Sequence, residues 1–210
     1  MKKRIFDWIY FGLIVFYFPS SSLVAQEYFS LNVDNDLYFE TDHYYSSGIF
    51  LQYGKQIETQ DTLKKYILWE LGQEIYTPDS RYTSNSTTFD YPYGGWTSLK
   101  LTFQKERSKK KQTQWGIQIG VTGDASGAQW MQNNYHRLVL RLPELPWTDQ
   151  VSQAFHLNAF LDSFNRWKLN EELSLQTHLF TTAGTQKIMG GAAAGFVTVS
   201  YTHLTLPTKA

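Results

Sequence analysis

Apolar and polar residues alternate along several separate segments of this chain, and this pattern restricts its fold more than any other feature of the sequence. The segments cover residues 29–33, 49–53, 67–71, 99–103, 115–121, 155–161 and 173–175. A period of two places successive side chains on opposite faces of a strand, so each segment is predicted to be a β-strand with one apolar face. The chain is therefore expected to be all-β, with antiparallel strands.

The composition favours strands that face a membrane. Aromatic residues make up 17% of the chain and charged residues only 18%, whereas globular proteins carry about 25% charged residues. Trp and Tyr prefer the membrane–water interface, where one side of the ring is wet and the other is apolar. After the N-terminus no segment has the roughly 18 consecutive apolar residues of a spanning helix, and inside lipid only helices and closed barrels satisfy the backbone. The sequence predicts an outer-membrane β-barrel, with a secreted β-sandwich as the alternative.

Charge and cysteine content exclude several functions. The chain has 19 basic and 19 acidic side chains and no long basic stripe, so nucleic acid is not an expected partner. It has no cysteine, which excludes a disulfide scaffold, a thiolate zinc site and a cysteine nucleophile. Any chemistry must therefore use His, carboxylates, hydroxyls, amides or a metal with oxygen ligands.

The N-terminus has the layout of a secretory signal peptide. Basic residues at positions 2–4 precede an apolar run over residues 5–18, and small residues then lead to Ala25. The run is shorter than the roughly 20 residues that a membrane-spanning helix needs. We expect cleavage close to Ala25, which makes residues 1–25 a signal peptide of an exported protein.

The last residues differ in character from the rest of the chain. Residues 199–208 resemble one reading frame of an adapter used in sequencing libraries, and an ordinary strand and turn is the alternative interpretation. We therefore interpret residues 199–210 as an artefact. Residues 26–198 are then one partial barrel domain.

Residues 123–142 interrupt the period of two. The composition within this segment suits a helix, so a short helical excursion is expected around residues 125–141. At 3.6 residues per turn, four polar side chains share one face of this helix. They are Gln129, Gln132, Asn133 and His136. A helix on a barrel ordinarily turns an apolar stripe toward it, so this polar face is a candidate site, with a structural role for His136 as the alternative.

Two further polar groups lie at strand ends. Asp34, Asn35 and Asp36 bring together oxygen-bearing side chains, which suit either a Ca²⁺ site or a solvated turn. Ser46 is out of phase with the apolar residue Ile49 of the same strand. Its side chain is therefore expected inside the barrel, where a serine is usually a hydrogen-bonding filler.

Several short motifs occur in one order along the chain, and together they resemble the lipid A 3′-O-deacylase family of outer-membrane β-barrels. They are ND at 35–36, TDHYYSSG at 41–48, IYTP at 75–78, DYPYGGW at 90–96, GDASG at 123–127, QWMQNNYH at 129–136 and WTDQ at 147–150. The resemblance covers about residues 27–160. It depends on the order of the motifs, because each motif alone is weak.

The resemblance implies a monomeric barrel of twelve strands in the bacterial outer membrane, with lipopolysaccharide as substrate. Twelve strands of about 10 residues each, with their loops, need more residues than 26–198 provide, so the barrel is expected to be incomplete here. The implied activity is a Ca²⁺-dependent hydrolysis of the ester that holds the 3′-linked acyloxyacyl group of lipid A. The implied site has His136 as general base beside Gln132, Asn35 and Asp36 at the metal and oxyanion, and Ser46 near the attacking water.

Ester hydrolysis agrees with the side chains that the chain contains, since an imidazole gains and loses a proton near neutral pH. Water is favoured over Ser46 as the nucleophile, because the sequence has no Gly-x-Ser-x-Gly motif. The alternatives are a non-catalytic barrel, either a channel or a lipid-binding protein, and a structural surface protein. Convergence of Asn35, Asp36 and His136 in one pocket would distinguish the hydrolase from these.

Overall fold

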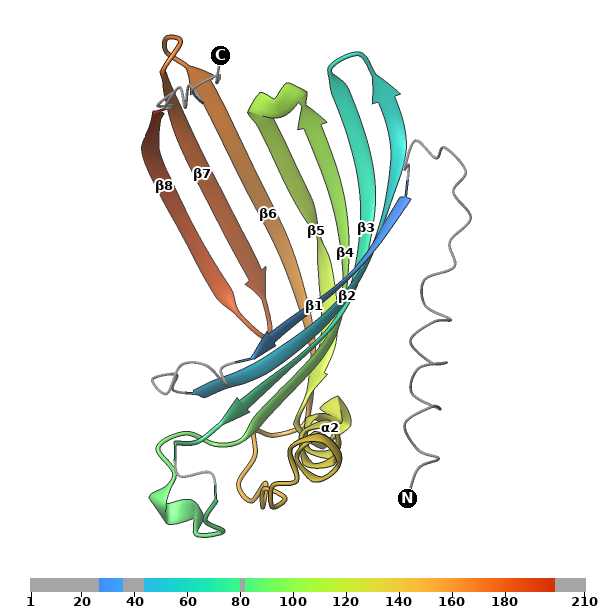
Figure 1. The fold of residues 1–210 in the computed structure, drawn as a ribbon, viewed down its shortest axis with the longest axis vertical. Coiled ribbons are helices and arrows are strands. Elements are labelled where there is room, and N and C mark those ends of the chain that lie inside the picture. The colour runs from blue at the N-terminus through green and yellow to red at the C-terminus, as the bar shows by residue number, and fades with distance from the viewer. Residues whose placement is uncertain (1–26, 36–43, 80–81, 199–210) are drawn as a thin grey trace, which may run out of the picture.

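A single antiparallel sheet of eight strands forms the body of the protein in the computed structural model, which describes residues 27–35, 44–79 and 82–198. The strands are β1 (Glu27–Asn35), β2 (Tyr44–Gln60), β3 (Leu63–Thr77), β4 (Gly94–Arg107), β5 (Lys111–Thr122), β6 (Ala154–Lys168), β7 (Leu173–Gly184) and β8 (Ile188–Thr198). Each strand pairs with the next one in the chain, and Figure 1 shows that the sheet curves. One curved layer excludes the predicted alternative of a two-layer sandwich.

The sheet has two edges within the part of the chain that the structure describes. β1 lies at one edge and β8 at the other, and no pairing joins them. The predicted signal peptide, Asp36 and residues 199–210 lie outside the described residues.

The strand register gives the sheet one apolar face and one polar face. A row of paired residues on one face contains Leu31, Leu51, Leu71, Leu99, Ile119 and Leu157, all of them exposed. The neighbouring row on the opposite face contains Ser30, Gln52, Glu70, Lys100, Gln118 and Asn158. Exposed leucines outside and polar side chains inside are the pattern of an outer-membrane barrel, so the fold class predicted from the periodicity is confirmed. The apolar face is called the outer face below.

The connections differ in length at the two ends of the sheet. Short turns join β2 to β3, β4 to β5 and β6 to β7, and the second of these contains η3 (Ser108–Lys110). At the opposite end, residues 78–93 join β3 to β4 and include η2 (Ser86–Thr88), residues 123–153 join β5 to β6, and a short turn of residues 185–187 joins β7 to β8. In outer-membrane barrels the long loops lie on the extracellular side, so this end of the sheet is called the loop end.

The segment between β5 and β6 contains the helical excursion that the sequence predicts. It consists of η4 (Gly123–Ser126), α2 (Ala128–Tyr135) and η5 (His136–Leu140). Gly127 joins η4 to α2 with a φ of 68°, a backbone conformation that favours glycine. None of the helices in the described ranges is long and apolar enough to cross a membrane.

A small hydrophobic core fixes this excursion at the loop end. It contains Ile75, Tyr93, Ala128, Leu145 and Trp147, with Phe89 packed against it. The rings of Tyr93 and Trp147 stack with their centroids 5.0 Å apart, and the Tyr93 amide donates to the Asp149 carbonyl at 3.2 Å. Because Ile75 comes from β3 and the other members come from the long connections, the core holds both connections against the wall of the sheet.

Two details differ from the sequence-based expectation. The alternation did not predict β8, because small residues dominate residues 190–195 and leave no contrast between its faces. Gln73 is also a polar exception to the apolar alternation, since it belongs to the outer face of β3 with Trp69 and Ile75. Gln73 is only 9% exposed, against 42% for Trp69, because the excursion covers the outer face at the loop end.

Candidate active site

The start of the excursion is hydrogen-bonded directly to the outer face. The Ser126 carbonyl accepts from Gln73 Nε2 and from Thr97 Oγ1, at 2.7 Å in each case. Gly95 of β4 leaves space for the excursion, because a Cβ at this position would meet Ser126 Oγ and Ala128 Cβ. The helix N-terminus is therefore in close contact with β3 and β4.

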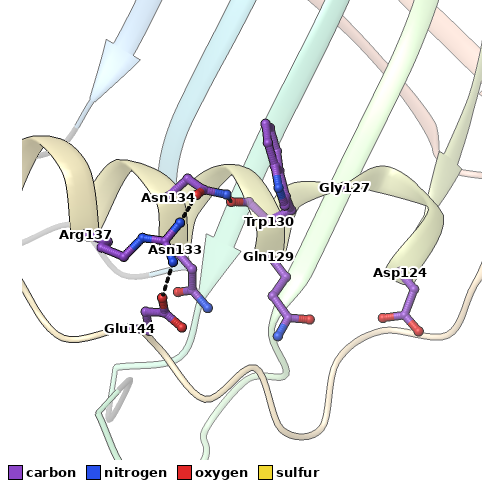
Figure 2. A pocket seen from close by; sticks show the side chains of 8 residues that line it. All are labelled: Asp124, Gly127, Gln129, Trp130, Asn133, Asn134, Arg137 and Glu144. Carbon is purple, nitrogen blue, oxygen red and sulfur yellow. Dashed lines mark hydrogen bonds and ion pairs between the residues drawn. The ribbon is translucent and has the colours of Figure 1, made fainter.

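The helix lies against the part of the wall formed by β3 and β4, which it contacts. Figure 2 shows its course from Gly127 to Arg137, with Trp130 and Asn134 between them.

A row of paired residues lies beneath this path at the loop end. Gly95 pairs with Ile75, Ile75 with Ser47, and Ser47 with Asn35 at the end of β1. The register thus brings the predicted residue Asn35 next to β2 at the level where the helix docks. The side chain of Asn35 and all of Asp36 lie outside the described part of the structure.

Ser46 lies on the outer face, which corrects the expectation that it faces the interior. The register of β2 and β3 shifts between Tyr45 and Ser47, so Ser46 is an extra residue in a β-bulge. Its hydroxyl lies 2.5 Å from Thr77 Oγ1, while a Cβ at Gly48 on the inner face would meet the Tyr45 hydroxyl. The bulge resets the alternation of side chains. Ser46 consequently lies on the same face of the wall as the helix.

His136 is oriented by a backbone carbonyl. Its Nδ1 lies 3.2 Å from the Pro143 carbonyl oxygen, and its own carbonyl accepts from the Leu142 amide at 3.0 Å. A carbonyl can only accept, so Nδ1 carries the proton in this contact and Nε2 keeps its lone pair. Among the described residues nothing is hydrogen-bonded to Nε2, and the imidazole is partly exposed. In a histidine base, a hydrogen bond at one ring nitrogen fixes the tautomer and leaves the other nitrogen able to accept a proton, and His136 has this arrangement.

The other polar side chains of the predicted helix face hold a segment that we call the strap, residues 142–147. Gln132 Oε1 accepts from Trp147 Nε1 at 2.9 Å, and Gln132 is buried. Asn133 makes two hydrogen bonds to the backbone of Leu145, at 2.8 and 3.0 Å. The shared face that the sequence predicts is confirmed for Gln132, Asn133 and His136, since all three contact the strap. Gln132 and Asn133 have a structural role there.

An open pocket of about 540 Å³ lies along α2, and its lining does not include His136, Gln132 or Ser46. Its lining residues are Asp124, Gly127, Gln129, Trp130, Asn133, Asn134, Arg137 and Glu144. In Figure 2, Arg137 connects Asn134, at 2.5 Å, with Glu144, at 3.5 Å. Gln129 and Asn133 of the predicted polar face line this pocket, whereas Gln132 and His136 do not.

A charged side chain orders the connection between β3 and β4. Asp90 Oδ1 accepts from the Asp79 amide at 3.1 Å, and this hydrogen bond is the main reason that the pKa of Asp90 lies below its ordinary value. Tyr44, at the start of β2, also donates to Asp90. The connection is thus joined to the first residue of β2, two positions before Ser46.

The described residues contain no group of three or more His, Cys, Asp or Glu side chains that could hold a metal ion. The predicted Ca²⁺ ligands are Asn35 and Asp36, and the structure describes only the backbone of Asn35. The oxygen donors nearest to it by register are the hydroxyls of Ser47 and Ser46. A calcium site therefore depends on residues beyond the described ranges.

Sequence reasoning missed three contributors to this site. Thr77 lies against Ser46, Gln73 anchors the helix, and the strap orients His136. A buried polar residue in an otherwise apolar alternation was the signal at Gln73. Thr77 belongs to the motif at 75–78, but no pattern in the sequence predicts its contact with Ser46, 31 residues away, or the contacts of the strap with the helix.

A curved antiparallel sheet with an apolar exterior, short turns at one end and long connections at the other defines an outer-membrane β-barrel protein. A family model described as outer membrane protein LpxR matches residues 9–198. The chain belongs to this family, and its location is the outer membrane. The prediction of a deacylase-type barrel from the order of the motifs is confirmed at the level of the family.

A solved structure supports the same fold. LpxR from Salmonella typhimurium matches with a TM-score of 0.57 and 20% sequence identity, over 68% of this chain and 48% of that chain. The chain thus spans about half the length of that protein. No curated protein matches the sequence.

Proposed function

We propose that this protein is an outer-membrane ester hydrolase that removes the 3′-linked acyloxyacyl group of lipid A, with His136 as its general base. One observation carries the proposal: the His136 imidazole is fixed through Nδ1 by the Pro143 carbonyl, at 3.2 Å, on a helix that lies against the outer wall. A substrate in the outer leaflet has its ester bonds at this wall. The family and its outer-membrane location support lipopolysaccharide as the substrate.

The geometry of the helix supports a site between η5 and β2. The helix is bonded to the outer face at the loop end through Ser126, and Ser46 and the backbone of Asn35 lie on neighbouring strands at the same end. In the proposal, the ester lies between His136 and these strands.

In this proposal, Nε2 of His136 accepts a proton from a water molecule, and the water oxygen forms a bond to the ester carbonyl carbon. The bond from this carbon to the alcohol oxygen then breaks, and the protonated imidazole gives its proton to that oxygen, so the acid and the alcohol are released. Ser46 and Thr77 then bind the water or the alcohol product, since their hydroxyls form one polar pair on the wall. Gln132 fixes the helix through Trp147 and acts as a positioning residue. Direct attack by Ser46 is the alternative within the same reaction class.

Ca²⁺ is the proposed cofactor, with Asn35 and Asp36 as its proposed ligands. A carboxylate and an amide oxygen suit this cation, and when bound it would supply positive charge near the developing oxyanion. The family resemblance, and the register position of Asn35 beside β2, support this part of the proposal.

The decisive experiment is mass spectrometry of lipid A from a host without a deacylase that expresses the full-length natural protein. Loss of the 3′-acyloxyacyl mass is expected for the wild type, and His136→Ala should reduce it by about 10²- to 10⁴-fold. Gln129→Ala is the matched control, because Gln129 is an exposed residue of the same helix. Heat-modifiability on gels checks that each variant folds. A wild type that never removes the group would favour the non-catalytic barrel instead.

A further inference from the structure

Three apolar side chains of the excursion are more exposed than most of those on the barrel wall. Trp130 is 71% exposed, Leu138 71% and Val139 61%. They occupy α2 and η5, which cover the outer face at the loop end. We call them the interfacial stripe.

Trp130, Asn134 and Leu138 follow a spacing of four residues, which places them along one side of a helix. Asn134 is the polar residue of this series, and both ends of its amide are already bonded. Its Nδ2 donates to the Trp130 carbonyl at 2.7 Å, and its Oδ1 accepts from Arg137 Nη2 at 2.5 Å. The cost of moving Asn134 into a less polar environment is therefore small.

The polar residues of the excursion point in a different direction from Trp130. In Figure 2 the Trp130 ring points along the strands, toward the body of the sheet, whereas Gln129, Asp124 and Glu144 point away from it. The helix thus has an apolar side toward the middle of the barrel wall and a polar side toward the loop end. This division across a helix axis is typical of helices that lie at a membrane surface.

The position of the helix indicates what covers the stripe. The excursion is bonded to the outer face through Gln73 and Thr97, so the stripe continues the apolar wall, whose Leu99 and Ile119 are exposed toward lipid. Arg137 and Arg141 are exposed beside the stripe. Cations at this level attract the anionic head groups of a bilayer.

We propose that the interfacial stripe is inserted into the lipid bilayer at the boundary between head groups and acyl chains, with α2 and η5 lying parallel to the membrane surface. Lipid, rather than a protein partner, is the occupant because the stripe is continuous with the lipid-facing wall. The insertion holds the His136 end of the helix at the depth of the head groups. The proposal depends on the outer-membrane location and not on the proposed hydrolysis.

The absence of cysteine allows the proposal to be tested with single labels. Leu138→Cys and Val139→Cys would each be labelled with an environment-sensitive nitrobenzoxadiazole dye, in the full-length natural protein inserted into phosphatidylethanolamine–phosphatidylglycerol vesicles, with any cysteine outside the printed chain replaced by serine. Gln129→Cys and Glu144→Cys are the matched controls on the polar side. Ile117→Cys, on the exposed outer face of β5, is the reference for a label in lipid.

The emission of labels at positions 138 and 139 should shift to the blue, and lipids that carry a nitroxide near the head group should quench them several-fold more than the labels at 129 and 144. Iodide in the water should quench the two control labels instead. Equal iodide quenching at 138 and 129 would overturn the proposal. A label at 138 that is shifted to the blue but insensitive to nitroxide lipids would also overturn it, because protein would then cover the stripe.

Discussion

At the scale of single residues, the proposed function depends on a few polar side chains on an apolar wall. Ser46 and Thr77 share a contact of 2.5 Å, and the bulge in β2 is what turns Ser46 toward this wall. His136 has one nitrogen bonded to the Pro143 carbonyl and the other available. The loss of rate on removal of Ser46, compared with the loss on removal of His136, distinguishes attack by water from attack by serine.

Ser46→Ala should lower the rate of deacylation by no more than about tenfold if water is the nucleophile, since it removes only one of the hydroxyls that bind the water. His136→Ala removes the base and should cost at least ten times more. The rates are measured by mass spectrometry of lipid A, with Ser47→Ala as the neighbouring control. A Ser46→Ala variant as inactive as His136→Ala, together with an acylated Ser46 in the wild type, would assign the attack to Ser46.

Removal of Ca²⁺ with a chelator should abolish deacylation, and addition of Ca²⁺ should restore it. Asn35→Ala should weaken binding of the metal about tenfold or more, because an oxygen ligand is lost. Terbium luminescence, measured on the folded protein, reports the binding without any assay of activity. The assignment fails if Asn35→Ala binds terbium as tightly as the wild type.

At the scale of elements, the helix is held on two sides. Its N-terminus is bonded to the barrel wall through Ser126, and its polar face is bonded to the strap through Gln132 and Asn133. Both attachments include side-chain hydrogen bonds to the backbone, and Gln132 adds a bond between side chains to Trp147. Such directional bonds fix the position of the helix more narrowly than apolar contact alone.

Asn133→Ala should release the strap, because it removes both hydrogen bonds to the Leu145 backbone. A loss of about 1–3 kcal/mol in the local free energy of opening is expected. Hydrogen exchange of residues 142–147 measures it. Asn134→Ala, which alters a neighbouring residue without a bond to the strap, is the control and should leave this exchange unchanged.

Gly95→Val should displace the helix from the wall while the sheet still forms. The new side chain would occupy the position of Ser126 Oγ and Ala128 Cβ, and valine itself is favourable in a strand. Protease cleavage within residues 123–147 should increase and deacylation should fall. Gly94→Ala is the matched control, since its Cβ would meet Tyr76 at an ordinary 3.4 Å. Equal protection of both variants would show that the close contact at Gly95 is not needed.

At the scale of the whole molecule, the described sheet has an apolar outer face and two unpaired edges. β1 and β8 each expose one row of backbone donors and acceptors within the described residues. Exposed strand edges pair readily with other chains.

The chain as printed, expressed without any additional sequence, should therefore aggregate in detergent rather than give a monomeric barrel. Size-exclusion chromatography and the shift of the band on heating of gel samples measure this. A monomer with a heat-modifiable band would show that β1 and β8 close on each other, contrary to the expectation.

The sequence by itself determined the class of fold and most of its elements. Alternation in residues 29–33 and 115–121 is visible because lipid and the polar interior impose opposite requirements on neighbouring side chains. The helix between β5 and β6 was predicted for the same reason, since its pattern departs from the period of two. β8 was not predicted, because its small residues can lie on either face and therefore show no alternation of apolar and polar side chains.

The tertiary structure alone decided how the site is assembled. The face of Ser46 depends on a bulge against β3, and its partner Thr77 lies 31 residues away. The position of the helix depends on Gln73 and Ser126, which are 53 residues apart. A local pattern records only whether a side chain meets water or an apolar environment. Which particular residues meet is determined by the register of paired strands and by close packing between distant segments, and neither leaves a periodic trace in the sequence.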